Sequence, residues 1–263
     1  MSGRVLITGA AGGLGAACVE RFVAGGWTVY AADLVAPASR DGVVPLQMDV
    51  TDQASVDGAF LTIDPAELSC VVNFAGILGV GPLMDVPAER LAQVLAINVV
   101  GTHRVNRAAF PLLRAGNGRI VNISSETGWQ RALPMNGPYA MSKHAVEAYS
   151  DALRRELMFV GMPVSVIQPG PFRTPMTGGI TRSFEAATVP GSPFEALTRR
   201  MGKLASREEG RGHDPALLAD VIWEAATAAR PRARYSVKPD LQRSVMHRMP
   251  AGLTDRALRR FLG

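Results

Sequence analysis

Short apolar runs alternate along the chain with longer segments in which apolar residues recur at helical spacing. The short runs are rich in Val, Ile and Leu, which is typical of strands buried on both faces. We expect strands at residues 4–8, 28–33, 43–48, 70–75, 119–124, 164–168 and 234–238. We expect helices at about 13–25, 52–61, 87–114, 138–160 and 215–229. This alternation predicts an α/β fold with a doubly wound parallel sheet of about seven strands and helices on both faces.

No repeat, low-complexity tract or Pro/Ser-rich linker divides the chain, so we expect a single domain over residues 1–263. The most irregular stretch is 175–212, which is rich in Gly, Ser, Thr and charged residues. Long connections in compact domains often act as lids. We therefore expect a substrate-binding lid there, with a weak helix near 194–203.

Composition favours a globular protein with a sizeable core, because 47% of the 263 residues are apolar. No run approaches the ~18 apolar residues of a membrane-spanning helix. The N-terminus lacks the basic start and long apolar run of a signal peptide, so we expect a cytoplasmic protein. The two cysteines and four histidines form no C-x-x-C or Cys/His cluster, and we expect no metal site.

The net charge of +5 arises in the last third of the chain. From Arg182 onward there are fifteen Lys or Arg against nine Asp or Glu. No nucleic-acid-binding motif accompanies this surplus, so we expect no nucleic-acid partner. The last expected helix, TDRALRRFL, has Thr254 as an N-cap candidate and places Arg256, Arg259 and Arg260 largely opposite its apolar residues. That pattern is typical of weak docking on an anionic membrane surface, although packing on its own domain or a sister subunit is the favoured interpretation.

The first expected strand runs into a glycine-rich turn, T-G-A-A-G-G-L-G, at residues 8–15. Glycines there let the backbone turn tightly and approach a pyrophosphate at the N-terminus of the following helix. Asp33 ends the second expected strand, 20 residues after Gly13. A carboxylate at that distance binds the adenosine ribose hydroxyls and repels a 2′-phosphate. The turn therefore predicts a Rossmann-type dinucleotide site, with NAD favoured over NADP.

Further motifs, in the right order, make the chain resemble the short, single-domain branch of the short-chain dehydrogenase/reductase family. They are T-G-x-x-x-G-x-G from Thr8, Asp49-Val50, N-F-A-G at 73–76, Asn98, I-S-S at 123–125, Y-x-x-x-K at 139–143 and P-G-P-F-R-T at 169–174. The stretches at 146–157 and 169–175 look most like the retinol and hydroxysteroid dehydrogenase group.

The resemblance implies an oxidoreductase and assigns roles to residues of this chain. The implied catalytic residues are Asn98, Ser125, Tyr139 and Lys143, with Ser124 as the alternative serine. The implied cofactor contacts are Gly9, Gly12, Gly13, Leu14, Gly15, Asp33, Leu34, Asp49, Val50, Asn73, Ala75, Gly76, Tyr139, Lys143, Pro169, Gly170, Phe172 and Thr174.

Tyr139 is the candidate base. Oxidising an alcohol needs a group that takes the hydroxyl proton, and a phenol with a pKa near ~10 is a poor base at neutral pH. Two positive charges would lower that pKa: Lys143, one helical turn along, and the oxidised nicotinamide ring. Ser125 would hold the substrate oxygen. The resemblance gives Asn98 the positioning of a water that links Lys143 to solvent.

The expected substrate pocket is apolar, with walls that include Trp129, Leu133, Met135 and Met176. Such walls favour a hydrophobic secondary alcohol, steroid-like or retinoid-like, and its ketone or aldehyde. One alternative is a β-ketoacyl thioester reductase, which would normally use NADPH and a basic residue near Asp33. Another is a catalytically silent NAD-binding regulator. The resemblance also implies pairing of helices 87–114 and 138–160 between subunits, so we expect a homodimer or homotetramer.

Overall fold

Seven parallel strands form one sheet in the order β3-β2-β1-β4-β5-β6-β7. The computed structural model describes residues 3–63, 68–173, 179–208 and 212–262. The strands are β1 (Arg4–Thr8), β2 (Thr28–Asp33), β3 (Val43–Gln47), β4 (Cys70–Asn73), β5 (Arg119–Ile123), β6 (Val164–Pro169) and β7 (Arg234–Val237). The chain reverses its direction of travel across the sheet between β3 and β4, where β4 pairs with β1 instead of β3. The predicted doubly wound α/β fold is confirmed.

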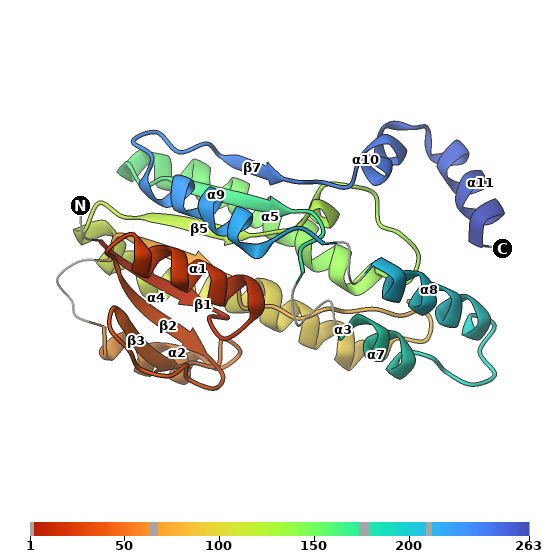
Figure 1. Cartoon of the computed structure of the whole chain (residues 1–263), viewed down its shortest axis with the longest axis horizontal. Helices are drawn as coiled ribbons and strands as arrows, with labels where there is room; N and C mark the ends of the chain where they lie inside the picture. The colour runs from red at the N-terminus through yellow and green to blue at the C-terminus, as the bar shows by residue number, and fades with distance from the viewer. Residues whose placement is uncertain (1–2, 64–67, 174–178, 209–211, 263) are drawn as a thin grey trace.

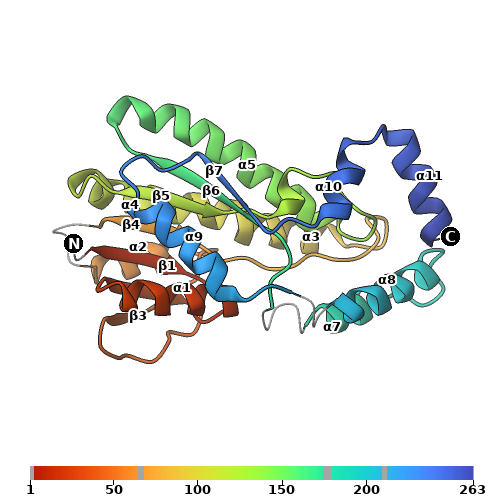
Figure 2. The same ribbon diagram turned by 45° about the horizontal axis from the view of Figure 1, so that its top comes forward.

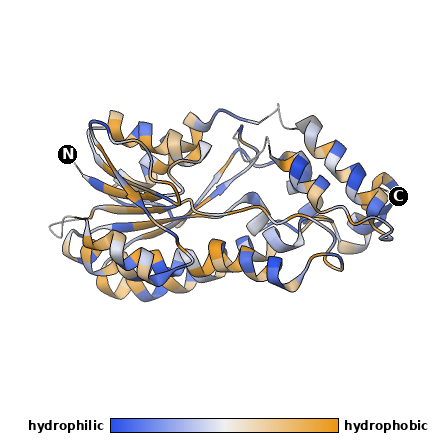
Figure 3. Cartoon of the chain, turned by 90° about the horizontal axis from the view of Figure 1, so that it is seen from below, coloured by the Kyte–Doolittle hydropathy of each residue, from blue (hydrophilic) through white to orange (hydrophobic). Residues whose placement is uncertain are grey.

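Helices cover both faces of this sheet (Figure 1). One face carries α1 (Gly13–Ala24) and α9 (Pro215–Thr227), and the other carries α2 (Gln53–Leu61), α4 (Thr102–Ala115) and α5 (Gly137–Leu157). Hydrophobic residues concentrate along the strands, whereas the helices at the far end of the molecule are more hydrophilic (Figure 3). None of the helices within the described ranges is long and apolar enough to cross a membrane.

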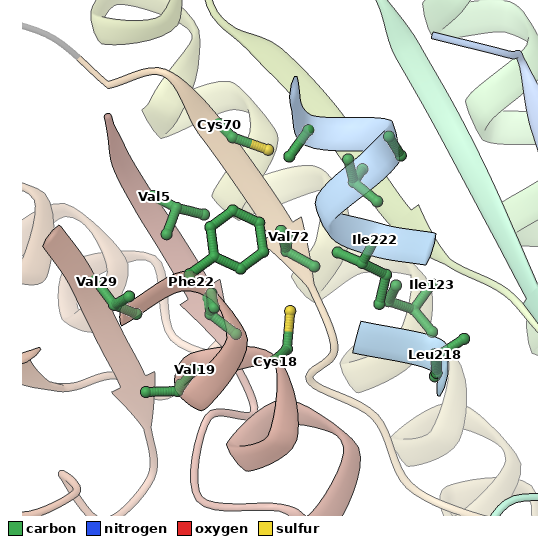
Figure 4. Close-up of a cluster of buried hydrophobic side chains, with 14 of the residues drawn as sticks. Val5, Cys18, Val19, Phe22, Val29, Cys70, Val72, Ile123, Leu218 and Ile222 are labelled. Atoms are coloured by element: carbon green, nitrogen blue, oxygen red, sulfur yellow. The ribbon is translucent and has the colours of Figure 1, made fainter. Parts of the chain in front are cut away.

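The core between β1, α1 and α9 is built around Phe22, which is fully buried (Figure 4). Its ring meets Trp27 and Trp223 edge to face, with centroids 5.3 and 5.2 Å away. Cys18 and Cys70 lie in the same apolar core as free thiols. Burial raises the pKa of Cys70 to about 12, so this thiol is a core residue and not a nucleophile.

The helix expected at 87–114 is divided in three. It begins as α3 (Ala88–Leu95), continues as the π-helical segment η1 (Ala96–Gly101) and resumes as α4. Hydrophobic periodicity cannot reveal the single wider turn of η1. Relative to an uninterrupted α-helix, one such turn shifts the apolar positions that follow by less than one residue. Such π turns occur often at functional sites, and η1 contains Asn98.

Four helices gather beyond the carboxyl ends of the strands, where Figures 1 and 2 show them at the same end of the molecule. They are α7 (Ile180–Ala186), α8 (Glu195–Glu208), α10 (Leu241–Arg248) and α11 (Ala251–Leu262). The first two lie in the expected lid segment, and the weak helix expected at 194–203 is the first part of α8.

The N-cap assignment of Thr254 was wrong. Helix α11 begins at Ala251, and Thr254 lies buried inside it with its hydroxyl bonded to the carbonyl of Met246. Arg131 donates to the same hydroxyl, and Arg200 donates to the carbonyls of Phe261 and Leu262. Helix α11 is therefore tied to its own domain at Thr254 and at its last two residues, while most of its other side chains are exposed.

Candidate active site

The glycine-rich turn between β1 and α1 is shaped by backbone contacts that exclude side chains. Gly9 has a φ of +67°, and a Cβ there would lie 2.9 Å from the backbone nitrogen of Ala75. A Cβ at Gly15 would lie 2.1 Å from the carbonyl oxygen of Gly9. Helix α1 begins at Gly13 with no side-chain cap on its first turn. Its free N–H groups therefore fit a pyrophosphate.

Asp33 lies at the carboxyl end of β2, beside this turn. Its Oδ2 accepts a hydrogen bond from the Ala11 nitrogen at 2.9 Å, and its Oδ1 accepts one from the Leu34 nitrogen at 2.8 Å. The carboxylate therefore fixes the turn as well as facing the cleft. An anionic group beside the turn suits ribose hydroxyls and disfavours a phosphate.

A cleft of about 890 Å³ runs along the carboxyl ends of the strands. The structure brings most of the predicted cofactor residues into its wall. These are Gly9, Gly12, Gly13, Leu14, Gly15, Asp33, Leu34, Asp49, Val50, Ala75, Gly76, Tyr139, Lys143, Pro169, Gly170 and Phe172. Thr174, also predicted, lies outside the described residues.

Asn73 was predicted to contact the cofactor, but it does not line the cleft. Its Nδ2 donates to the side-chain oxygens of Asn106 at 2.7 Å and Asn122 at 2.9 Å. Asn122 in turn donates to Ser150 at 2.9 Å. Asn73 therefore belongs to a buried polar cluster that joins β4 and β5 to the helices behind them, because its side chain points away from the carboxyl edge.

Lys143 and Tyr139 project from the first turns of α5 into the same end of the cleft. The Lys143 Nζ donates to the carbonyl of Ile123 at 2.9 Å and lies 5.6 Å from the Tyr139 ring centroid. Ser125 follows β5 and lies close enough to the Tyr139 hydroxyl to lower the pKa of that phenol. Ser124, the alternative serine, instead contacts the carbonyl of Lys143 at 3.4 Å and is buried. The geometry favours Ser125.

The electrostatics at Tyr139 differ from the expected lowering by Lys143. Burial raises the pKa of Tyr139 to about 12, while the Ser125 hydrogen bond and the charge of Arg243 lower it and Glu126 raises it. Burial also lowers the pKa of Lys143 to about 8, with Glu147 acting in the opposite direction. Both shifts have one cause, which is that the end of α5 lies in a low-dielectric interior. The lysine ammonium is directed at a carbonyl, so it does not offset the burial of the phenol.

Asn98 lies behind the cleft and not in its wall. Its Oδ1 accepts from the Ile77 nitrogen at 2.8 Å, and its Nδ2 donates to the Ile77 carbonyl at 3.0 Å and to Ser142 at 2.9 Å. The wider turn of η1 places this side chain between the segment after β4 and helix α5. Asn98 thus joins the two segments that frame Tyr139 and Lys143.

Three of the predicted substrate-wall residues, Trp129, Leu133 and Met135, do not line the described cleft. Trp129 packs edge to face on His247, with centroids 5.3 Å apart, and Met135 is buried against Thr198 of α8. Neither they nor Leu133 line the cleft, because the chain after the 3-10 helix η2 (Glu126–Gly128) turns toward α10 and α8. Met176 lies outside the described residues.

The apolar wall is formed by other residues, which the sequence reading missed. They are Phe74, Ile77, Leu78, Ala96, Ile97, Pro171 and Ile180, besides the predicted Phe172. Ile77 and Leu78 follow N-F-A-G directly, so their place beside the cleft could have been inferred from that motif. Ile180, at the start of α7, carries no such signal in the sequence.

The glycine turn, the acid after β2 and the Ser125–Tyr139–Lys143 group together define a dinucleotide-dependent oxidoreductase site. The comparisons agree with this class. A family profile described as short chain dehydrogenase matches residues 4–184. A protein named NADPH-dependent 3-dehydrocapnine reductase, from Ornithobacterium rhinotracheale, is 33% identical over 95% of this chain and 94% of its own length. Retinol dehydrogenase 16 of Rattus norvegicus is 32% identical over 88% of this chain and 79% of its own.

A solved structure of a short chain dehydrogenase/reductase from Burkholderia phymatum in complex with NAD has the same fold. It superposes with a TM-score of 0.76 at 23% identity, covering 93% of this chain and 92% of that one. The chain belongs to the short-chain dehydrogenase/reductase family, near its retinol dehydrogenase-like members. It is a short-chain alcohol dehydrogenase or reductase that uses a nicotinamide cofactor.

Proposed function

We propose that the chain interconverts a lipophilic alcohol, steroid-like or retinoid-like, and the corresponding ketone or aldehyde, with NAD as the cofactor. The observation that supports this most is the position of Ser125, Tyr139 and Lys143 at one end of a cleft whose other end is the glycine turn. The wall near Tyr139 is apolar, with Ile77, Leu78 and Phe172 among its residues. An apolar wall with a few convergent polar groups suits a hydrophobic substrate.

In this proposal the bound nicotinamide supplies or accepts the hydride. Ser125 holds the substrate oxygen beside Tyr139, which takes the hydroxyl proton during oxidation and returns it during reduction. Lys143 places a positive charge 5.6 Å from the phenol ring and holds the Ile123 carbonyl at the end of β5. Asn98 keeps the segment after β4 against α5, and so keeps the cleft wall in place.

The choice of NAD rests on Asp33. We expect Asp33→Asn to raise the kcat/KM ratio of NADP to NAD by about tenfold or more, since removal of the charge ends its repulsion of a 2′-phosphate. Asparagine retains one acceptor, for the Ala11 N–H that fixes the turn, and loses the acceptor for the Leu34 N–H. Steady-state kinetics with both cofactors measure the ratio, and Asp41→Asn in the loop after β2 is the matched control. An unchanged ratio in Asp33→Asn would contradict the assignment.

The substrate class is tested with a panel of alcohols and ketones, assayed by nicotinamide absorbance. The panel contains steroid-like, retinoid-like and small polar alcohols, each with NAD and with NADP. The proposal expects kcat/KM to rise with the apolar area of the alcohol. Turnover of small polar diols without turnover of any lipophilic alcohol would refute the substrate class.

We also propose that copies of the chain associate through the faces of α4 and α5. Exposed apolar side chains on or beside these helices support this, including Val100, Met141 and Phe159. Burying such side chains between subunits would stabilise a dimer. Light scattering at micromolar concentration should give at least twice the mass of one chain, and the mass of a single chain would contradict it.

A further inference from the structure

Glu126, the residue after Ser125, is a buried carboxylate with partners far away in the sequence. Only 5% of its surface is exposed. Its Oε1 accepts from Arg243 Nη1 at 2.7 Å, and its Oε2 accepts from the Asp240 nitrogen at 2.7 Å. Both donors belong to α10 or its N-cap, at the C-terminal end of the chain. A buried ion pair that is also hydrogen-bonded fixes the position of both partners.

Further contacts hold α10 on the turn that follows Ser125. Arg243 Nη2 donates to Thr127 Oγ1 at 3.3 Å, and Gln130 Nε2 donates to Ser244 Oγ at 3.1 Å. The turn η2 is capped in turn by Ser125, whose Oγ accepts from the Thr127 nitrogen at 3.2 Å. Contacts thus lead from α10 through η2 to Ser125, and Ser125 lies beside Tyr139, where it lowers the pKa of the phenol.

We propose that Arg243 is a positioning residue of the active site, which acts through Glu126 and Thr127 to hold Ser125 against Tyr139. This rests on the proposed function, because it assumes that the Ser125–Tyr139 pair acts on the substrate. Helix α10 then supports the catalytic end of the cleft from behind, although none of its residues lines the described cleft wall.

The ion pair between Arg243 and Glu126 also affects the pKa of Tyr139, which gives a second, electrostatic way to test the proposal. Arg243 lowers the pKa of Tyr139 and Glu126 raises it. Lys143 lies on the same helix as Tyr139, and Asp240 faces Glu126 from the start of α10, where its charge raises the pKa of Glu126. Removing only one member of the ion pair leaves the other charge buried beside the phenol. The two single substitutions should therefore move the titration of Tyr139 in opposite directions.

The experiment compares Arg243→Gln, Glu126→Gln and the double variant with Arg248→Gln. Arg248 is exposed on the same helix, so its substitution is the matched control. Arg243→Lys tests whether a positive charge alone rescues the site. Two quantities are measured: the pH dependence of kcat for alcohol oxidation, and backbone hydrogen exchange at residues 125–129. Exchange requires no turnover, so it reports on the position of η2 independently.

We expect Arg243→Gln to lower kcat at neutral pH by about tenfold and to shift the rising limb of the profile to higher pH. Glu126→Gln should shift that limb to lower pH, and in the double variant the limb should return close to its wild-type pH, because the two opposing charges are both gone. Backbone hydrogen exchange at residues 125–129 should be faster in Arg243→Gln than in the wild type. It should return toward the wild-type rate in Arg243→Lys, and it should be unchanged in Arg248→Gln.

Profiles and exchange that are the same in Arg243→Gln and Arg248→Gln would overturn the proposal. Shifts of the rising limb in the same direction in both single variants would overturn it too. A loss of packing alone would not move the two pH profiles in opposite directions. Faster exchange in Arg243→Gln, with no turnover of any alcohol or ketone by the wild type, would uphold the positioning contact and refute the proposed function instead.

Discussion

Tyr139→Phe is expected to lower kcat for alcohol oxidation by about 10²- to 10⁴-fold, the usual contribution of a positioned proton-transfer group. The phenylalanine ring keeps the packing of α5 but has no hydroxyl to take the substrate proton. Cofactor affinity should stay within about threefold of the wild type, because the glycine turn and Asp33 lie at the other end of the cleft. Pre-steady-state hydride transfer and fluorescence titration of the cofactor measure the two quantities separately.

The matched control is Tyr149→Phe, the same change ten residues along the same helix. The Tyr149 hydroxyl bonds Asn106 at 3.3 Å and lies outside the described cleft wall, so its loss should leave kcat close to the wild-type value. If Tyr139→Phe retained more than about a third of wild-type kcat with chemistry rate-limiting, Tyr139 would not be the base. A silent NAD-binding protein would show no turnover even before substitution.

Lys143→Met is expected to have two effects of opposite sign: less activity and more stability. Turnover should fall by about 10²-fold or more, because the ammonium that holds the Ile123 carbonyl in the cleft wall beside Tyr139 is lost. The wild-type lysine carries a penalty, since burial lowers its pKa from 10.5 to about 8. A shift of that size corresponds to about 3 kcal/mol at neutral pH. Loss of the hydrogen bond to the Ile123 carbonyl offsets about 1 kcal/mol or more of this penalty. We therefore expect the free energy of unfolding of the variant to exceed that of the wild type by about 1 to 2 kcal/mol.

The pH dependence of this gain follows from the direction of the shift. Between pH 8 and 10.5, the lysine binds more protons in the unfolded chain than in the folded one. Wild-type stability relative to Lys143→Met therefore rises with pH across this window, and the advantage of the variant shrinks. Urea unfolding at pH 7 and pH 10 measures the difference. Lys203→Met, at an exposed position on α8, is the control. A variant less stable than the wild type at pH 7 would contradict the account.

The sheet was the most predictable part of the molecule. The inner strands of this parallel sheet are buried on both faces, so their runs of Val, Ile and Leu are visible without any knowledge of their neighbours. The strand ends then place the glycine turn, Asp33 and Ser125 at one edge, because the carboxyl ends of parallel strands meet there. The cleft residues near the cofactor followed from these local patterns.

The parts that sequence reading missed depend on contacts between distant segments. Nothing near Glu126 indicates that Arg243, 117 residues later, will pair with it. The pKa of Tyr139 was expected to fall through Lys143 and a bound oxidised nicotinamide, whereas within the chain itself burial is the largest influence and raises this pKa. The position of Trp129 and Met135 outside the described cleft wall has the same origin, because these side chains pack on α10 and α8, which the local pattern does not specify.

The central claim is that this chain transfers hydride between a lipophilic alcohol and a nicotinamide. Secondary alcohols labelled with deuterium at the carbinol carbon, incubated with the protein and NAD⁺, test it most directly. Mass spectrometry of the recovered cofactor should show one deuterium in the reduced nicotinamide and the matching ketone as product, and Tyr139→Phe should abolish both. Ketone without deuterium in the cofactor, or no reduced cofactor from any alcohol in the panel, would contradict the claim.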